Sequence, residues 1–382
     1  MLMKEFIFRI FKLKEKYLYL SIILSFFIIA YYHLNSGYYM SSDSRTFSGM
    51  ADNLIKLDLN IFDFSRRVPT FFITIPVSLI ALCKTIFTDK WQHAFLLLNL
   101  TLLFFSMIIF AKTLLIIKVR SFLIFLTLLL IVMSVDVLTW PRYILSDMIY
   151  AFLVILITYF ITKGFVENKY NYLVILLISF LILTTRPSSI SVIFAIVFFI
   201  TISNYEFFLK PRIILISIFI LFFLVPLIFG LLYYFIELNF SENTQLEWWL
   251  LSKVKLGMII HDRPETWVNS PNSFKDVVYI YFLRLINFFN PYAVTFSITH
   301  NILNIFQMLL IILSISIWLF FGGYMRNQDK LFFFILLISF STASFHSFTL
   351  IDYDWRYRFP IILPLIMLFP ISIEMILKKH KI

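Results

Sequence analysis

The chain has 382 residues, of which 61% are apolar and only 14% are charged, and its mean hydropathy is +0.92. Soluble domains are nearer half apolar and a quarter charged, so this composition excludes an ordinary soluble fold. The net charge of +11 sits in short loops and tails between apolar runs, which indicates orientation in a membrane rather than nucleic-acid binding. The single cysteine, Cys83, excludes an intramolecular disulfide.

Eleven apolar runs are candidates for membrane-spanning helices, because a span needs about 20 mostly apolar residues and a helix satisfies its own backbone groups in lipid. They cover residues 17–33, 69–83, 93–111, 121–137, 147–162, 170–184, 187–203, 212–236, 300–321, 331–349 and 359–377. We therefore predict an all-α fold, a polytopic transmembrane bundle that forms a single domain over residues 1–382.

Basic residues set the expected orientation. The head before residue 17 and the tail after residue 377 are both rich in lysine, which predicts that both termini are cytoplasmic. Two cytoplasmic ends require an even number of spans, so one of the eleven runs does not cross. The best candidate is 69–83, which is short and contains Pro76. We expect about ten spans plus this re-entrant or surface helix.

The remaining loops agree with this topology. The basic loops near residues 112–120, 163–169, 210–212 and 326–330 fall on the cytoplasmic side. The two long polar stretches, 34–68 and 237–299, fall on the outer side. The expected organisation is thus one membrane domain with a first outer loop and a large outer loop.

The first outer loop contains an expected amphipathic helix. Phe47, Met50, Ala51 and Leu54 recur at helical spacing, which predicts a short helix lying on the outer membrane surface. Asp43 stands at the expected N-cap of this helix, with its carboxylate at the mouth of the bundle. Asp43 is therefore either only a cap or a functional carboxylate.

Four further charged residues fall on the outer side in this topology. Asp147 begins an apolar run, where it is either an N-cap or a functional acid. Arg186 lies in a minimal turn and either snorkels to lipid headgroups or, as we favour, holds a phosphate. Arg356 and Arg358 alternate with aromatic residues before the last run, as an interfacial anchor or as a functional pair.

The large outer loop offers weaker signals. Its acidic and histidine residues, which include Glu247, His261 and Glu265, fit no metal-binding spacing, so we interpret them as solvated loop residues. Residues 274–289 have an amphipathic pattern and are expected to lie on a surface.

Two carboxylates and several arginines on one side of a membrane suit a transferase that acts on a lipid-phosphate-linked donor. The arginines would hold the phosphate at headgroup level, and a carboxylate would take the proton from an acceptor hydroxyl. The acidic pair could alternatively hold a divalent cation against the phosphate, because oxygen ligands suit such ions.

Five short motifs, in order along the chain, resemble those of the GT-C superfamily of membrane glycosyltransferases. The first, Asp43-Ser44-Arg45-Thr46-Phe47-Ser48-Gly49-Met50-Ala51-Asp52-Asn53-Leu54, is similar to the family's pattern D-S-x-x-Y-x-x-M-A-x-N-L. The others are Arg66-Arg67-Val68-Pro69, Ser146-Asp147, Thr185-Arg186-Pro187 and Arg356-Tyr357-Arg358 followed by Pro360 and Pro364.

This resemblance implies a GT-C-like fold and an inverting transfer of a hexosyl or pentosyl group. The donor would be a polyprenyl-phosphate-linked sugar, and the acceptor a lipid, glycan or protein at the outer face of a bacterial cytoplasmic membrane. It makes Asp43 the catalytic residue and Asp147 a second active-site acid. Four arginines would contact the donor phosphate: Arg67, Arg186, Arg356 and Arg358.

Two other functions remain open from the sequence. A surface-polysaccharide polymerase would use arginines of the large outer loop, here Arg263 and Arg284, in place of Asp43. A lipid-linked sugar flippase or transporter would carry charged residues deep within its spans. The span interiors are almost free of charge, which disfavours the transporter.

Overall fold

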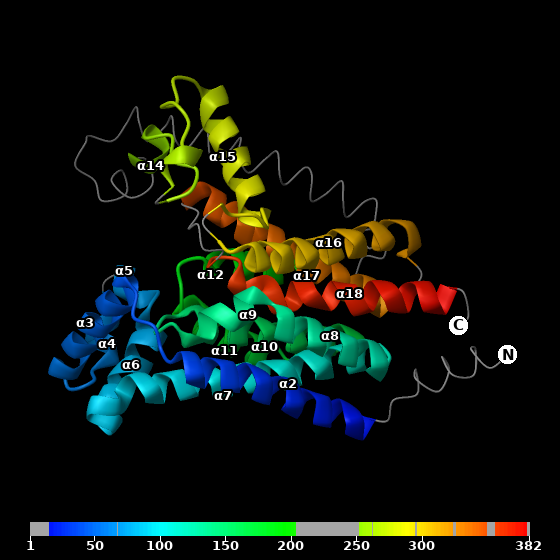
Figure 1. Ribbon diagram of the computed structural model, residues 1–382, viewed down its shortest axis with the longest axis horizontal. Helices are drawn as coiled ribbons and strands as arrows, with labels where there is room; N and C mark the ends of the chain where they lie inside the picture. The colour runs from blue at the N-terminus through cyan, green and yellow to red at the C-terminus, as the bar shows by residue number, and fades with distance from the viewer. Residues whose placement is uncertain are drawn as a thin grey trace.

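The computed structural model describes residues 15–66, 68–203, 252–261, 263–294, 296–323, 326–349 and 356–379. Every regular element in these ranges is a helix, and the β-bridge between Tyr39 and Tyr143 is isolated. The predicted all-α fold is therefore confirmed for the described part of the chain (Figure 1).

The N-terminal half contains the elements that form one end of the molecule and most of its centre. They are α2 (Glu15–Ser36), α3 (Ser42–Lys56), α4 (Ile61–Ser65), α5 (Val68–Phe71), α6 (Thr74–Phe87), η1 (Thr88–Lys90), α7 (Trp91–Ile116), α8 (Ser121–Met133), α9 (Val135–Thr139), η2 (Trp140–Arg142), α10 (Asp147–Val166), α11 (Tyr172–Leu183) and α12 (Ser189–Ile202).

The C-terminal half adds three long helices and a smaller helical unit. These elements are α14 (Ser252–Lys255), η5 (Pro264–Thr266), α15 (Phe274–Phe289), α16 (Ile298–Phe321), α17 (Arg326–Thr349) and α18 (Phe359–Lys379). Figure 1 shows α16, α17 and α18 running along the bundle, whereas α15 rises away from it.

Six helical stretches among the described residues are long and apolar enough to cross a membrane. Helix α8 with the α9–η2 segment, bent by 53° at Ser134, would be a seventh. Helices α11 and α12 are apolar but have only 12 and 14 residues. The chain is thus a membrane protein, and the total of about ten spans stays a prediction, since run 212–236 lies outside the described residues.

Two of the loops predicted to be cytoplasmic, near residues 112–120 and 326–330, lie at one end of the bundle, and the predicted loop at 210–212 lies outside the described residues. Helix α2 begins and α18 ends at that end of the bundle (Figure 1). The Lys378 ammonium donates to the carbonyl of Lys118 at 3.3 Å, and the Gln328 amide donates to the carbonyl of Ile117 at 3.2 Å. The basic segments that sequence assigns to one side therefore meet in space, as the topology predicts.

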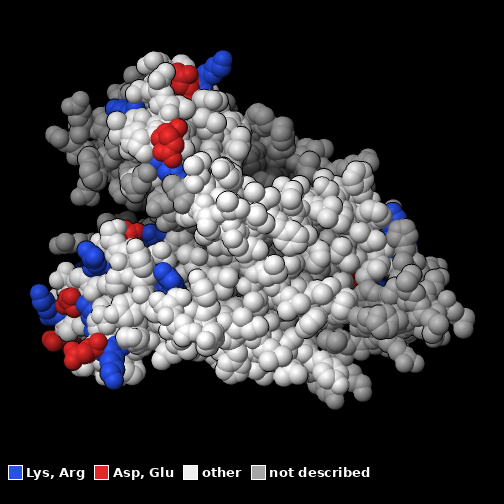
Figure 2. All heavy atoms as spheres, in the orientation of Figure 1, with Lys and Arg blue, Asp and Glu red and all other residues white. Residues whose placement is uncertain are grey.

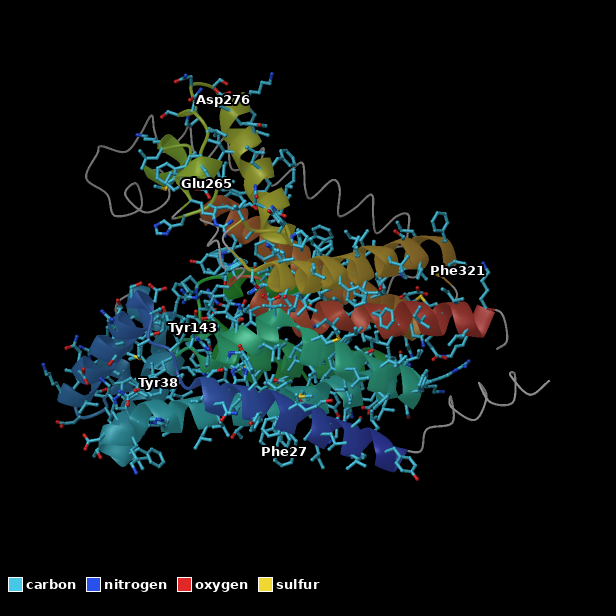
Figure 3. The ribbon with its side chains drawn as sticks, viewed as in Figure 1. Phe27, Tyr38, Tyr143, Glu265, Asp276 and Phe321 are labelled. Carbon is cyan, nitrogen blue, oxygen red and sulfur yellow. The ribbon has the colours of Figure 1, made fainter. Side chains whose placement is uncertain are left out.

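Charged residues avoid the middle of the bundle. In Figure 2 they gather over the α3–α6 end and over the α14–α15 unit, while the surface along α2, α8, α16 and α18 is almost bare of them. Large apolar side chains cover this bare surface, such as Phe27 on α2, labelled in Figure 3, which is 63% exposed. Such a belt is the surface expected to face lipid.

Helix α3 is amphipathic as predicted, and part of its apolar face packs against helix α6. Ala51 and Leu54 are fully buried in the same core as Val77 of α6. The Lys84 ammonium, also from α6, donates to the Asp52 carboxylate at 2.7 Å. Because α6 presents both an apolar face and a matching charge, α3 is held against protein, and its place at the membrane surface stays a prediction.

The run 69–83 corresponds to α5 and most of α6. Helix α6 has 14 residues, which is about 21 Å at 1.5 Å per residue and shorter than the hydrocarbon core of a bilayer. It continues into η1 and α7 through Thr88, which has φ +41°. That this run does not cross the membrane stays a prediction.

Helix α15 has the boundaries that its amphipathic pattern predicts, and its buried side is covered by protein. Tyr281 packs edge-on against Phe348 of α17, with ring centroids 5.5 Å apart. Arg284 is fully buried and donates to the carbonyls of Met258, Ser347 and Phe348. Helices α14 and α15, which belong to the predicted large outer loop and are called the outer-loop unit below, are thereby attached to the C-terminal end of α17.

Candidate functional site

Four charged side chains from distant parts of the chain meet at the end of the bundle opposite the α18 terminus. They are Asp43 in the first turn of α3, Asp147 at the start of α10, Arg186 in the α11–α12 turn, and Arg356 just before α18. In Figure 3, Tyr143, four residues before Asp147, marks this end, and Phe321 marks the opposite end.

Asp147 lies at the centre of the cluster. Its Oδ1 accepts a hydrogen bond from Arg186 Nη1 at 2.5 Å, and its Oδ2 accepts one from Arg356 Nε at 3.2 Å. Only 1% of its side chain is exposed. The predicted capping role is wrong by one residue, because Ser146 is the N-cap of α10. A carboxylate this deeply buried needs both cations beside it, since an unpaired buried charge is strongly destabilising.

Asp43 is also not a cap. The N-cap of α3 is Ser41, whose hydroxyl accepts from the Ser44 amide at 3.1 Å, while the Ser44 hydroxyl accepts from the Ser41 amide. This reciprocal pair satisfies the helix start without Asp43. The Asp43 carboxylate is instead paired with Arg356 Nη1, and 53% of the side chain remains exposed.

Arg356 joins the two carboxylates. One edge of its guanidinium contacts Asp147 and the other contacts Asp43. Burial alone would lower the pKa of Arg356, but the two carboxylates, Asp147 above all, raise it above its ordinary value. Arg356 therefore stays charged. Its planar guanidinium, which we predicted to bind phosphate, lies between the buried Asp147 and the exposed Asp43.

A column of stacked rings supports the second arginine. The Arg186 guanidinium lies over the ring of Tyr357, 4.8 Å from its centroid. Tyr357 stacks on His346 at 4.2 Å, with an interplanar angle of 9°, and His346 stacks on Phe288 of α15 at 5.9 Å. The column links the outer-loop unit to the charged cluster, and cation–π contact helps to fix the Arg186 plane.

Arg358 does not join the other predicted phosphate ligands. Its Nη2 donates to Asp136 Oδ2 of α9 at 3.3 Å, and both side chains are almost completely buried. Sequence analysis missed Asp136, although a carboxylate inside the apolar run 121–137 was a signal for it. Arg67, the fourth predicted ligand, lies outside the described residues.

The arginines of the large outer loop are held by protein. Arg284 is fully buried among backbone carbonyls, as described above. Arg263 is 8% exposed and its guanidinium lies 6.0 Å from the ring centroid of Phe296. The described ion pairs of Asp43 and Asp147 are formed by Arg186 and Arg356.

The described residues of the cluster do not suit a divalent cation. Both oxygens of Asp147 accept hydrogen bonds from arginines, and the Asp43 carboxylate also faces an arginine. No group of three His, Cys, Asp or Glu side chains within reach of one ion occurs among the described residues. A metal needs several oxygen donors that are not already committed to cations.

The cluster combines a dry part with an accessible part. Asp147 is sealed between Arg186 and Arg356, whereas Asp43 reaches solvent. Among the described residues, two carboxylates balance two guanidiniums in formal charge. An incoming anion could take a guanidinium edge from Asp43 and leave that carboxylate able to accept a proton.

Comparisons with known proteins identify no relative. No protein-family model matches the chain, no curated protein matches it, and no solved structure matches its fold.

Proposed function

We propose that the chain is a membrane glycosyltransferase that moves a sugar from a polyprenyl-phosphate carrier to an acceptor hydroxyl at the outer face of the membrane. The observation that carries this proposal is the convergence of Asp43, Asp147, Arg186 and Arg356 at one end of the bundle. The motif resemblance of these residues to the GT-C superfamily supports it independently.

The proposed reaction assigns a role to each group. Asp43, the accessible carboxylate, accepts the proton of the acceptor hydroxyl as its oxygen bonds to the anomeric carbon. The bond between that carbon and the phosphate oxygen breaks, and the departing polyprenyl phosphate keeps the electron pair. Arg186 and Arg356 stabilise the charge on the phosphate.

Asp147 has a different role in this proposal. Its carboxylate is buried and bound to both arginines, so it holds their guanidinium planes and does not exchange protons with substrate. This assignment replaces the expectation of a second active-site acid. Pre-orienting donors in a dry site is a large contribution to catalysis of this type.

The position of Arg284 favours this function over a polysaccharide polymerase. The polymerase alternative uses arginines of the large outer loop to bind a pyrophosphate-linked donor. Arg284 is fully buried and its guanidinium is bound to backbone carbonyls, so it serves to attach α15. The Asp43 cluster is the better candidate for a phosphate site.

The test is complementation of a deletion strain with the wild-type gene, with Asp43→Asn, or with the matched control Asp63→Asn. Asp63 is an exposed carboxylate of the same outer loop, paired with Arg66 at 2.9 Å. Mass spectrometry of membranes would measure polyprenyl-linked sugar. We expect Asp43→Asn to accumulate it, with transfer lowered about a hundredfold or more, and Asp63→Asn to behave as wild type. Full transfer by a normally expressed Asp43→Asn protein would refute the proposal.

A further inference from the structure

A buried ion pair outside the proposed active site holds the chain segment that carries Arg356. Residues 356–358 make three successive attachments: Arg356 to Asp147 and Asp43, Tyr357 to the Arg186–His346 stack, and Arg358 to Asp136. We propose that Asp136 is a positioning residue, which fixes Arg358 and thereby sets the guanidinium of Arg356 in the phosphate site. Its functional meaning rests on the proposed glycosyltransferase activity.

The Asp136–Arg358 pair is unusually dry for an ion pair. Its side chains are 2% and 1% exposed, and the oxygen–nitrogen distance is 3.3 Å. Taking two charges out of water offsets most of their mutual attraction, so such a pair adds little to stability compared with apolar residues of the same size. A charged pair buried in an apolar bundle is therefore expected to serve a function.

A second buried carboxylate shows what is particular to Asp136. Glu374, near the opposite end of α18, is also buried, but its partners Arg120 and Lys378 are 25% and 33% exposed. Glu374 and its two partners lie at the end of the bundle where α18 ends, far along the helix from Arg356. Glu374 is thus a matched control for the loss of a buried carboxylate that contacts a cation.

The element that carries Asp136 is itself firmly attached. Asp136 lies in α9, just after the bend that separates α9 from α8. Buried His33 of α2 contacts the carbonyl of Val137 at 3.0 Å, and the Asn99 amide of α7 donates to the carbonyls of Pro141 and Tyr143. Two long helices, α2 and α7, therefore hold the short α9–η2 segment in place. Because Asp136 belongs to this segment, its ion pair fixes the position of Arg358.

The other side of the segment is held separately. Arg284 donates to backbone carbonyls at the C-terminal end of α17, and α17 is the helix that precedes residues 356–358 in sequence. Loss of Asp136 should therefore release the start of α18 without detaching α17. The expected result is a local change at Arg356, not a general loosening of the bundle.

The test is the rate at which phenylglyoxal modifies individual arginines of the purified full-length protein, followed by peptide mass spectrometry. Arg66, whose side chain is 79% exposed, is the reference for reagent reactivity, and buried Arg284 reports global loosening. In Asp136→Asn we expect Arg356 to react on the order of tenfold faster, the factor for losing one hydrogen bond to a charged group. Asp136→Glu should restore the slow rate, and Glu374→Gln should leave it unchanged.

A second variant covers misfolding. If Arg284 also becomes reactive in Asp136→Asn, that variant has unfolded. The test is then made with Arg358→Lys, because this variant keeps the positive charge of the side chain and loses its planar fork. Faster modification of Arg356 with slow Arg284 supports the proposal. A wild-type rate at Arg356 in the folded variants, or equal acceleration by Glu374→Gln, overturns it.

The same assay separates this inference from the proposed function. Added undecaprenyl phosphate should protect wild-type Arg356 from phenylglyoxal, whereas undecaprenol, which lacks the phosphate, should not. Failure of protection would count against the proposed function alone. The comparison of Asp136→Asn with wild type is made without ligand and decides the positioning role by itself.

Discussion

Asp147 and Arg186, 39 residues apart in sequence, form a buried ion pair at 2.5 Å that joins the start of α10 to the α11–α12 turn. The backbone supports the same junction, because the amide of Ile75 at the start of α6 donates to the carbonyl of Thr184 at 3.1 Å. Arg356 then adds the start of α18 to this pair. The charged cluster is therefore a point where several helices are fixed relative to one another.

Replacing Asp147 should destabilise the folded protein. Asp147→Asn would leave Arg186 and Arg356 as buried charges without their shared carboxylate, at a cost of about 3 to 5 kcal/mol. We expect a clearly lower midpoint of thermal unfolding in detergent. Asp63→Asn, which removes an exposed carboxylate, should change stability by less than about 1 kcal/mol. Equal midpoints of thermal unfolding for the two variants would show that the ion pairs of Asp147 do not fix the helices relative to one another.

The docking of α3 on α6 predicts a contrast between two leucines. Leu54 is fully buried and Leu57, one turn later, is 44% exposed. Leu54→Ala should lower the free energy of unfolding by about 2 to 5 kcal/mol, and Leu57→Ala should change it by less than about 0.5 kcal/mol. Thermal unfolding in detergent measures both. If α3 did not pack on α6, the two variants would unfold alike.

Arg284 is expected to hold the outer-loop unit in place. Arg284→Met removes the donors that satisfy the carbonyls of Met258, Ser347 and Phe348, and unpaired buried carbonyls are unfavourable. Hydrogen exchange should become faster across α15, while exchange in α10 stays slow. Arg66→Met, at an exposed arginine, is the control. Unchanged exchange in α15 would show that other contacts hold this unit.

The sequence predicted most of the charged groups that meet, since Asp147, Arg186 and Arg356 do so, and Arg358 does not. The distribution of lysine and arginine predicted which loops lie on each side of the membrane. Once Asp147, Arg186 and Arg356 were assigned to the same side, few arrangements of the helices would keep these three side chains apart. The reason is physical: a charged group in an apolar bundle must reach water or an opposite charge. The same reasoning placed the loops near Lys118 and Gln328 beside the C-terminal helix.

Details of local structure were harder to predict from the sequence. The N-caps lie at Ser41 and Ser146, not at Asp43 and Asp147, because several adjacent residues can cap a helix and a sequence pattern alone does not locate the first helical residue. The docking of α3 depended on the apolar face of α6, which an amphipathic pattern alone does not identify.

The assignment of Arg358, just before the start of α18, required the three-dimensional structure. Arg358 is one residue beyond Tyr357 and two beyond Arg356, and a motif treats all three as one unit. In the fold, Arg358 belongs to Asp136 in a separate buried pair. The helix-like turn over residues 356–358 directs consecutive side chains to different neighbours, and the partner of each depends on how α9 packs.

The most direct test of the central claim is the affinity of the purified protein in nanodiscs for undecaprenyl phosphate, compared with undecaprenol. We predict that the wild type prefers the phosphate and that Arg186→Lys weakens its binding on the order of tenfold, because lysine lacks the planar fork. Arg120→Lys, at the arginine–carboxylate pair of the opposite end, should bind as wild type. Equal affinity for the two lipids, or full affinity in Arg186→Lys, would contradict a phosphate site built on these arginines.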